Sequence, residues 1–177
     1  MKLSPVQQRY ILHWGEMGTR WGINRTVAQV HALLYLSPLP LNAEEIAKTL
    51  AVARSNVSTS LRELQSWGIV KVVHVLGDRR DHFEAMKDVW EMFNVVVDER
   101  KRREIDPTLA LLRSLVAELE KSGASDAYTK ERLREMLEFF ETMTSFYQEI
   151  RRMPAGALRD LAKLKGKVRK LLGLGGD

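Results

Sequence analysis

Residues 42–71 read NAEEIAKTLAVARSNVSTSLRELQSWGIVK, and this stretch decides the fold. Asn42 is followed three residues later by Glu45, a spacing typical of the capping box that starts a helix. The sequence therefore predicts a short helix over residues 43–50. Three apolar positions of this helix are expected to dock on a core: Ile46, Ala47 and Leu50.

A second helix is expected to follow the tight turn at residues 51–52 and to run to Trp67. Val57, Leu61 and Leu64 are spaced by four and three residues, which predicts a buried stripe along one face. The outward face then carries side chains that offer hydrogen bonds and positive charge: Arg54, Ser55, Asn56, Ser58, Thr59 and Arg62.

A β-hairpin is expected directly after these two helices. Residues 69–75 are mostly β-branched and too short for a convincing helix, and residues 81–85 alternate as a return strand. The turn Gly77–Arg80 carries an arginine pair, Arg79 and Arg80. Two strands alone are marginally stable in water, so the hairpin must lean on the helices before it.

Two further helices are expected upstream. Ser4, the proline that follows it, and Gln7 form a capping-box pattern, which predicts a helix that ends near residues 18–22. Asn24 is placed to cap another helix, which runs through Leu36.

A proline-containing breaker at residues 37–41 separates these helices from the short one. The order helix, helix, short helix, tight turn, helix, hairpin is that of a winged helix-turn-helix. We therefore expect a mainly α protein in which residues 1–87 form a winged helix-turn-helix DNA-binding domain with one hairpin as its wing.

Everything after Asp88 is expected to be helical, with a kink or restart at Asp106-Pro107. The expected helices span residues 88–104, 106–121, 126–152 and 155–172. They display more apolar surface than one small chain can cover, so residues 88–177 are predicted to be a dimerisation region and the protein a homodimer.

The last expected helix, residues 155–172, has leucines on one side and lysines on the other. Such a helix could lie on an anionic membrane or pack on a partner subunit. Packing on a subunit is favoured, because the two preceding helices already need a partner.

Composition narrows the class of protein. The chain has 177 residues, no cysteine and a net charge of +5, with balances of +4 over residues 1–87, −3 over 88–153 and +4 over 154–177. The absence of cysteine excludes disulfides, thiolate metal sites and a cysteine nucleophile. Neither a secretory signal nor a membrane-spanning run is present, so a cytoplasmic protein without a membrane partner is expected.

No catalytic constellation is visible in the sequence. His13 and Glu16 share a helix face but have no third metal ligand, and the other three histidines, at positions 31, 74 and 82, are scattered. No nucleophile elbow, phosphate loop or dinucleotide fingerprint occurs. We therefore expect no enzyme activity, no metal and no cofactor.

Taken together, the outward polar set and the arginines of the hairpin turn favour double-stranded DNA as the partner, because Arg, Asn, Ser and Thr can meet base edges and phosphates. Two recognition helices, held by the dimer, would enter successive major grooves. Two alternatives remain: a polar helix face that meets only water, and a winged-helix module that binds protein without sequence-specific DNA binding.

Two segments carry a family resemblance. Residues 33–85, above all SNVSTSLRELQSWG followed by GDRRDHFE, resemble the MarR-like winged-helix regulators, and residues 15–32 fit their GbsR-type branch. The resemblance implies a homodimeric transcriptional regulator, expected to be a repressor. It also implies that Arg54 to Thr59 face the groove and that Gly77 to Arg80 form the wing tip.

One residue departs from the pattern of the family. Ala53 stands where relatives commonly place a capping serine, a loss of on the order of 1 kcal/mol unless Ser55 substitutes. The recognition helix is therefore expected to start within a residue or two of Ala53.

Aromatic side chains raise the question of an effector, since some regulators of this family respond to small osmolytes or their precursors. The expected cage for a quaternary ammonium group consists of Trp14, Trp21, Trp90 and Phe93. Further aromatic residues, Phe139, Phe140, Phe146 and Tyr147, could contribute. The alternative, that these rings fill the core and the subunit contact, is favoured.

Overall fold

The computed structural model describes residues 2–121 and 127–153. The chain divides into two compact units, residues 1–96 and residues 97–177, which are considered separately below. The predicted helix at residues 155–172 lies outside the described residues.

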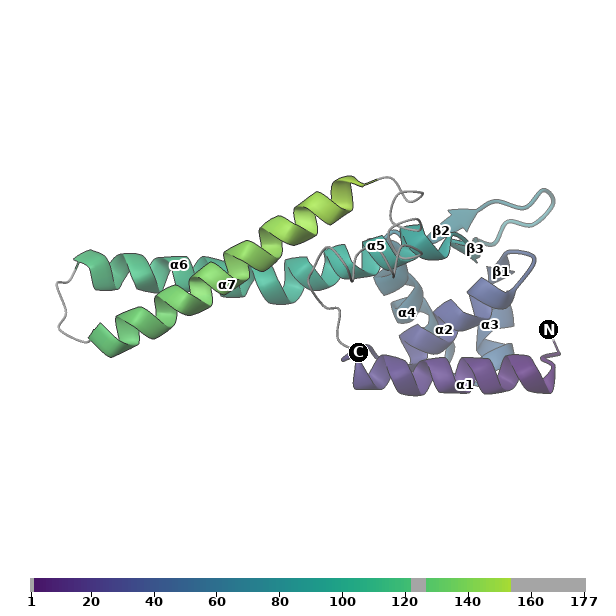
Figure 1. Ribbon diagram of the computed structural model, residues 1–177. Helices are drawn as coiled ribbons and strands as arrows, with labels where there is room; N and C mark the ends of the chain where they lie inside the picture. Colours follow the sequence, from purple (N-terminus) through teal and green to yellow (C-terminus); the bar gives the residue numbers. More distant parts are fainter. Residues whose placement is uncertain (1, 122–126, 154–177) are drawn as a thin grey trace, which may run out of the picture. The chain divides into compact units, whose positions relative to one another are not determined.

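The first unit contains four helices, α1 (Pro5–Arg20), α2 (Arg25–Leu36), α3 (Ala43–Leu50) and α4 (Arg54–Ser66) (Figure 1). Both predicted capping boxes are confirmed. The Ser4 hydroxyl accepts from the Gln7 amide, whose side chain accepts from the Ser4 amide. The Asn42 side chain accepts from the amides of Glu44 and Glu45, and the Glu45 carboxylate accepts from the Asn42 amide.

The sheet has three antiparallel strands, where the sequence predicted only the two strands of a hairpin. Strands β2 (Val70–Val73) and β3 (His82–Ala85) form the expected hairpin, and β1 (Leu41–Asn42) pairs with the other edge of β3. Phe83 of β3 lies opposite Val72 on one side and Leu41 on the other. The wing is thereby joined to the residue that caps α3.

The core of this unit is centred on α2, which buries seven of its residues. Val30, Leu33 and Leu34 are buried there with Ile46 of α3 and with Val57, Leu61 and Leu64 of α4, as the apolar spacing predicted. Helix α1 crosses α2 closely, since a Cβ at Gly18 would lie 2.5 Å from the Cβ of Ala28. A winged helix-turn-helix is the observed fold.

The C-terminal end of α2 is closed by a lysine from beyond the sheet. The Lys87 ammonium donates to the carbonyl oxygens of Leu34, Tyr35 and Ser37 at 2.8, 2.8 and 2.9 Å. Leu34 and Tyr35 belong to the last turn of α2, where carbonyls lack full sets of intrahelical partners, and Ser37 is the C-cap residue. Burial lowers the pKa of Lys87.

Helix α5 (Val89–Arg100) begins as predicted, with the Asp88 carboxylate accepting from the amides of Trp90 and Glu91. A π-helical turn at Lys101–Ile105 joins it to α6 (Asp106–Lys121). The predicted break at Asp106-Pro107 is therefore a widened turn within a continuous helical path. Pro107 has no amide to donate to the preceding turn, and a π turn is one way to accommodate such an interruption.

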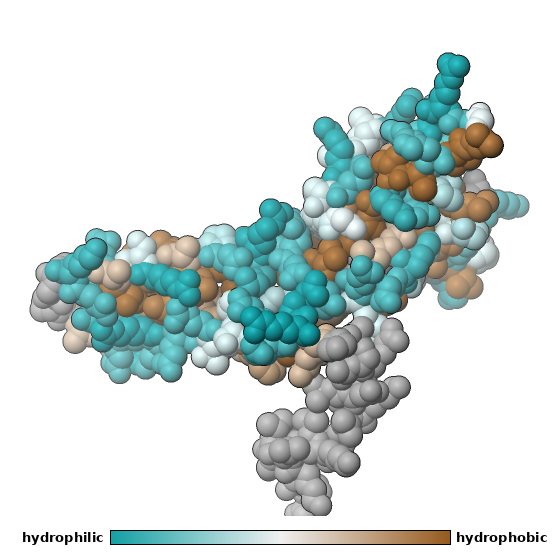
Figure 2. Space-filling model, turned by 90° about the horizontal axis from the view of Figure 1, so that it is seen from above, coloured by the Kyte–Doolittle hydropathy of each residue, from teal (hydrophilic) through white to brown (hydrophobic). Residues whose placement is uncertain are grey.

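In the second unit, α6 packs against α7 (Ala127–Arg152). Arg113 of α6 pairs with Glu141 of α7 at 2.9 Å. The Tyr147 hydroxyl donates to Asp98, to which Arg151 is also paired at 3.1 Å, and burial is the main cause that raises the pKa of Tyr147 to about 12. Among the described residues of α6 and α7, only Leu109, Leu112 and Val116 are buried, and Figure 2 shows hydrophobic residues at the surface of this part of the molecule.

Within the described ranges, no helix combines the length and the apolar character that crossing a membrane requires.

Candidate nucleic-acid interface

Helix α4 presents two contrasting faces. Its inner face is buried and includes Val57, Ser60, Leu61 and Leu64. All six predicted contact residues on this helix are exposed: Arg54, Ser55, Asn56, Ser58, Thr59 and Arg62. The pattern of apolar residues thus predicted correctly which side of α4 faces solvent.

The first turn of α4 shows where the recognition helix starts. The helix begins at Arg54, and its N-cap residue Ala53 makes no side-chain capping bond. Ser55 does not replace the missing serine as a cap. The first amides of α4 are therefore free of side-chain acceptors from the cap residue, at the end of a helix where partial positive charge accumulates.

The two wing arginines have different surroundings. The Arg80 guanidinium is paired with Asp78, with Nε 2.9 Å from Oδ1, and the same carboxylate accepts from the Arg80 amide. These contacts raise the pKa of Arg80 and hold the pKa of Asp78 well below its usual range. Arg79 is exposed and makes no ion pair with any residue that the structure describes. No local pattern around residues 79 and 80 distinguishes the two arginines in advance.

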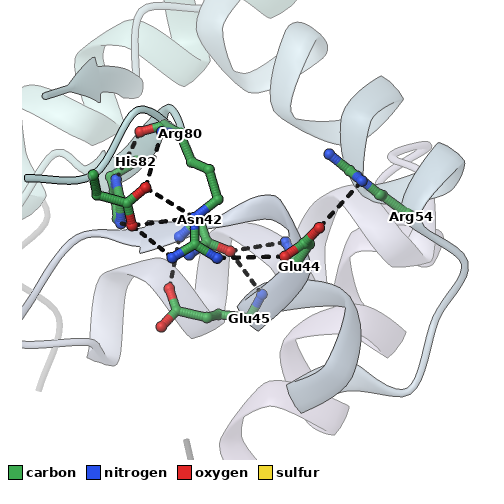
Figure 3. A network of polar contacts seen from close by, with 7 residues as sticks. Asn42, Glu44, Glu45, Arg54, Arg80 and His82 are labelled. Carbon is green, nitrogen blue, oxygen red and sulfur yellow. Dashed lines mark hydrogen bonds and ion pairs between the residues drawn. The ribbon is translucent and has the colours of Figure 1, made fainter. Parts of the chain in front are cut away.

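A single carboxylate connects the wing with the recognition helix. Glu44 lies in the first turn of α3, and its Oε1 is 3.3 Å from Arg54 Nη1 while its Oε2 is 3.4 Å from Arg80 Nη1 (Figure 3). Sequence reasoning missed Glu44 as a functional candidate. The capping pattern drew on Asn42 and Glu45 alone, and residues 36 positions apart give no local signal of contact.

These side chains line a groove of about 390 Å³ between the start of α3, α4 and the sheet. Four of the predicted contact residues contribute to its lining: Arg54, Ser58, Arg62 and Arg80. The other four are exposed residues outside the lining: Ser55, Asn56, Thr59 and Arg79. The groove combines three guanidinium groups with hydroxyl and amide side chains, a set suited to phosphate and base edges.

The predicted aromatic cage is only partly assembled. Trp14 and Trp21 are edge to face, with ring centroids 6.3 Å apart, and both line a small cavity of about 70 Å³. Trp67, which sequence reasoning did not include, lines the same cavity. Trp90 and Phe93 are not part of its lining, and Phe93 is exposed.

His31 is the titratable residue in the lining of this cavity. Its ring is buried and stacks on Tyr35, and its Nε2 has no hydrogen-bond partner among the described residues. Burial, and secondarily the charge of Lys87, lowers the pKa of His31 to about 4. The ring is therefore neutral at physiological pH.

The comparisons with known proteins all find similarity to transcriptional regulators. Residues 21–81 match the model of the MarR family. Two repressors of Bacillus subtilis (strain 168) are similar over 136 residues: the HTH-type transcriptional repressor GbsR at 22% identity, covering 75% of both chains, and OpcR at 20% identity, covering 75% of this chain and 74% of OpcR.

A solved crystal structure described as that of a transcriptional regulator has the same fold. Its TM-score is 0.62 at 24% identity, and the match covers 83% of this chain and 96% of that one. These matches confirm the predicted resemblance to the MarR-like regulators of the GbsR type: residues 21–81 match the model of the MarR family, and the chain is similar to GbsR over about three quarters of its length.

Proposed function

We propose that this protein is a sequence-specific DNA-binding transcriptional repressor that acts as a homodimer in the cytoplasm. The observation that carries the proposal is the groove beside α4, where Arg54, Arg62 and Arg80 lie with the polar side chains of the recognition helix. A polar face that met only water would not require guanidinium groups from both the helix and the wing. The named function of GbsR and OpcR as transcriptional repressors supports the same conclusion.

The two parts of the surface have different tasks in this proposal. Asn56 sits in the first turns of α4, on a rigid helix, where an amide can make a bidentate contact with adenine. Arg79 sits on the wing tip, where its charge suits phosphates or a minor groove. Base readout requires fixed geometry, whereas phosphate contact requires mainly charge.

The test begins with a footprint on the protein's own upstream DNA, followed by fluorescence anisotropy on the protected duplex and a scrambled duplex. Asn56→Ala is expected to weaken operator binding by roughly 1–3 kcal/mol and to change scrambled-DNA binding little. Arg79→Ala is expected to weaken both and to reduce the salt slope by about one unit. The matched controls are Asn94→Ala on α5 and Arg9→Ala on α1, which should do neither.

Two results would contradict the assignment. Equal weakening of operator and scrambled DNA by Asn56→Ala would mean that α4 does not read bases. No protected site and no preference among duplexes would favour the alternative of a winged-helix module that binds protein.

The homodimer is supported by the second unit. Its α7 has no buried residue along its 26 positions, and α6 buries only Leu109, Leu112 and Val116. Phe139, Met143 and Phe146 of α7 are exposed. Such a helical pair gains little from its own burial, and a second copy of the chain is the partner that can cover it. The lysine-rich segment 155–172 is proposed to add to the same subunit contact.

The proposal also includes a small-molecule effector that controls DNA binding. Its site would be the cavity beside Trp14 and Trp21, and a quaternary ammonium cation is the ligand chemistry that these rings suit. The cavity of about 70 Å³ must widen to admit choline. A choline-dependent thermal shift that is lost in Trp21→Ala but kept in Phe93→Ala would support this site, and no shift would remove it.

A further inference from the structure

The side chain of Glu44 is not needed to cap helix α3, in whose first turn it lies. The capping of α3 is complete without it, because Asn42 and Glu45 form the reciprocal capping bonds and Glu44 contributes only its backbone amide. The Glu44 side chain instead extends to Arg54 of α4 and Arg80 of the wing (Figure 3). The carboxylate therefore links three elements that are separate in sequence.

The two ion pairs are poor candidates for structural bonds. Arg54, Arg80 and Glu44 are 69%, 54% and 54% exposed, and their contacts of 3.3 and 3.4 Å are longer than ideal charge-assisted hydrogen bonds. Exposed pairs of this kind contribute little to the free energy of unfolding. Their effect is on where the two guanidinium groups lie and on what else can approach them.

We propose that Glu44 is a positioning residue of the DNA-binding surface, whose carboxylate occupies Arg54 and Arg80 in the free protein and is displaced by a backbone phosphate on binding. The proposal rests on the proposed function and extends it to what the arginines of the surface contact before DNA binds. A lone phosphate contact on non-specific DNA must compete with the carboxylate. Any duplex that brings a phosphate to Arg54 and Arg80 must displace the carboxylate, so operator DNA carries the same cost and base contacts by α4 add to its affinity separately.

The surroundings of the two arginines agree with this role. Arg62 lines the same groove. Its one side-chain hydrogen bond among the described residues, from Nη2 to the Thr59 hydroxyl, is long at 3.4 Å, so its guanidinium can bind a phosphate without displacing a carboxylate. The contacts of Arg80 with Asp78 do not involve Glu44, so the wing tip is expected to retain its local fold when the carboxylate is displaced.

The experiment compares three variants of the full chain by anisotropy on operator and scrambled duplexes over a range of salt concentrations. Glu44→Gln removes the competing charge, Glu44→Asp keeps the charge but shortens the side chain by one methylene, and Glu84→Gln is the control. Glu84 lies on β3 and pairs with Lys71 at 2.7 Å, so its replacement changes net charge equally without touching the groove. Thermal unfolding checks that each variant is folded.

Glu44→Gln is expected to tighten binding to operator and scrambled DNA by a similar factor of about 3- to 10-fold, because the cost of displacing the carboxylate is removed from both complexes. It should also steepen the salt slope by about one unit, because salt counterions replace the internal carboxylate on the free arginines. Glu44→Asp is expected to leave scrambled binding within about twofold and to weaken operator binding about threefold, as one arginine loses its position. Glu84→Gln should change the affinity for either duplex less than twofold and leave the salt slope unchanged.

Equal effects of Glu44→Gln and Glu84→Gln would overturn the proposal, since charge alone would then explain them. Weaker binding of both duplexes by Glu44→Gln would overturn it as well, because that is the signature of a structural role. If wild type shows no operator preference, the proposed function fails, but the salt slope of Glu44→Gln on scrambled DNA still tests displacement of the carboxylate. A slope unchanged from wild type would then count against Glu44 separately.

Discussion

The two units of the chain differ in where their apolar side chains lie. In the first unit, α2 is almost enclosed by α1, α3, α4 and the sheet, and residues such as Leu33 have no exposed surface. In the second unit, α7 contributes no buried residue, and large apolar side chains such as Phe139 and Phe146 are 57% and 60% exposed. The first unit has an internal core, whereas the described part of the second unit leaves several large apolar side chains exposed.

This contrast indicates that the two units have different functions. A rigid winged helix-turn-helix can fix the geometry of α4, because every apolar residue that positions it is supplied by the same unit. The helical unit leaves its apolar side chains available for another chain. Mutations in the two units should therefore differ in how their effects depend on protein concentration.

The largest expected effect is on the core of the first unit. Leu33→Ala should lower the free energy of unfolding by about 3–5 kcal/mol, because the removed methyl groups leave a cavity in a fully enclosed site. Urea denaturation measures the loss. The matched control is Leu111→Ala on α6, where the leucine is 59% exposed and the expected loss is below about 1 kcal/mol. Similar losses for the two leucines would break the comparison.

Buried His31 makes the first unit sensitive to acid. The folded-state pKa is about 4, below the unfolded value near 6.5, so between these values the unfolded chain binds a proton that the folded chain does not. Above pH 6.5 the neutral, buried His31 does not reduce stability. As the pH falls from 6.5 towards 4, the free energy of unfolding decreases by on the order of 3 kcal/mol. Denaturation at several pH values should show this dependence, and His31→Gln should reduce it.

The matched control for this prediction is His74→Gln, which changes an exposed ring and should leave the pH dependence intact. A direct NMR titration of the His31 imidazole in the wild-type protein covers the case in which His31→Gln does not fold. Protonation of that ring near pH 6.5 would show that the site is open to water.

A smaller effect is expected on the apolar face of α7. Phe139→Ala and Phe146→Ala should each weaken the homodimer by about 1–3 kcal/mol, because aromatic side chains at the centre of an interface contribute most to association. Sedimentation over a range of concentrations measures this. Leu76→Ala, at a fully exposed leucine near the wing tip, should leave association unchanged. A monomeric wild type at micromolar concentration would overturn the prediction.

The smallest expected effect is at the start of α4. Ala53→Ser should raise the free energy of unfolding by about 1 kcal/mol, because the new hydroxyl can accept from an amide of the first turn that has no side-chain cap. Thermal denaturation would detect the change. The control is Ala51→Ser, just before α4, where a serine is not placed to cap the helix. A stabilisation by Ala51→Ser alone would place the cap elsewhere.

Local patterns in the sequence predicted what depends on neighbouring residues. The caps at Ser4, Asn42 and Asp88 were correct because each lies within three residues of its partners. The exposed face of α4 followed from the spacing of its apolar residues. These features arise from helix geometry alone, so no knowledge of tertiary contacts was needed.

Features that depend on distant residues were missed. Strand β1 is only two residues long and follows a proline-rich segment, so its strand character comes entirely from pairing with β3. The link between Glu44 and Arg80 joins the start of α3 to the wing, and nothing in either segment indicates the other. The aromatic cavity contains Trp67 rather than Trp90 because its lining depends on how α1 and α4 pack.

The triple contact of Lys87 with the end of α2 has a consequence for how the wing moves. Lys87 follows β3 by two residues, so its ammonium fastens the base of the wing to carbonyls of the most enclosed helix. In a hydrogen-exchange experiment, the amides of β3 should therefore exchange together with those of α2. Their opening free energy should be nearly the free energy of unfolding of the whole unit. The residues between β2 and β3 should exchange orders of magnitude faster, so the wing behaves as a fixed base that carries a pliable tip.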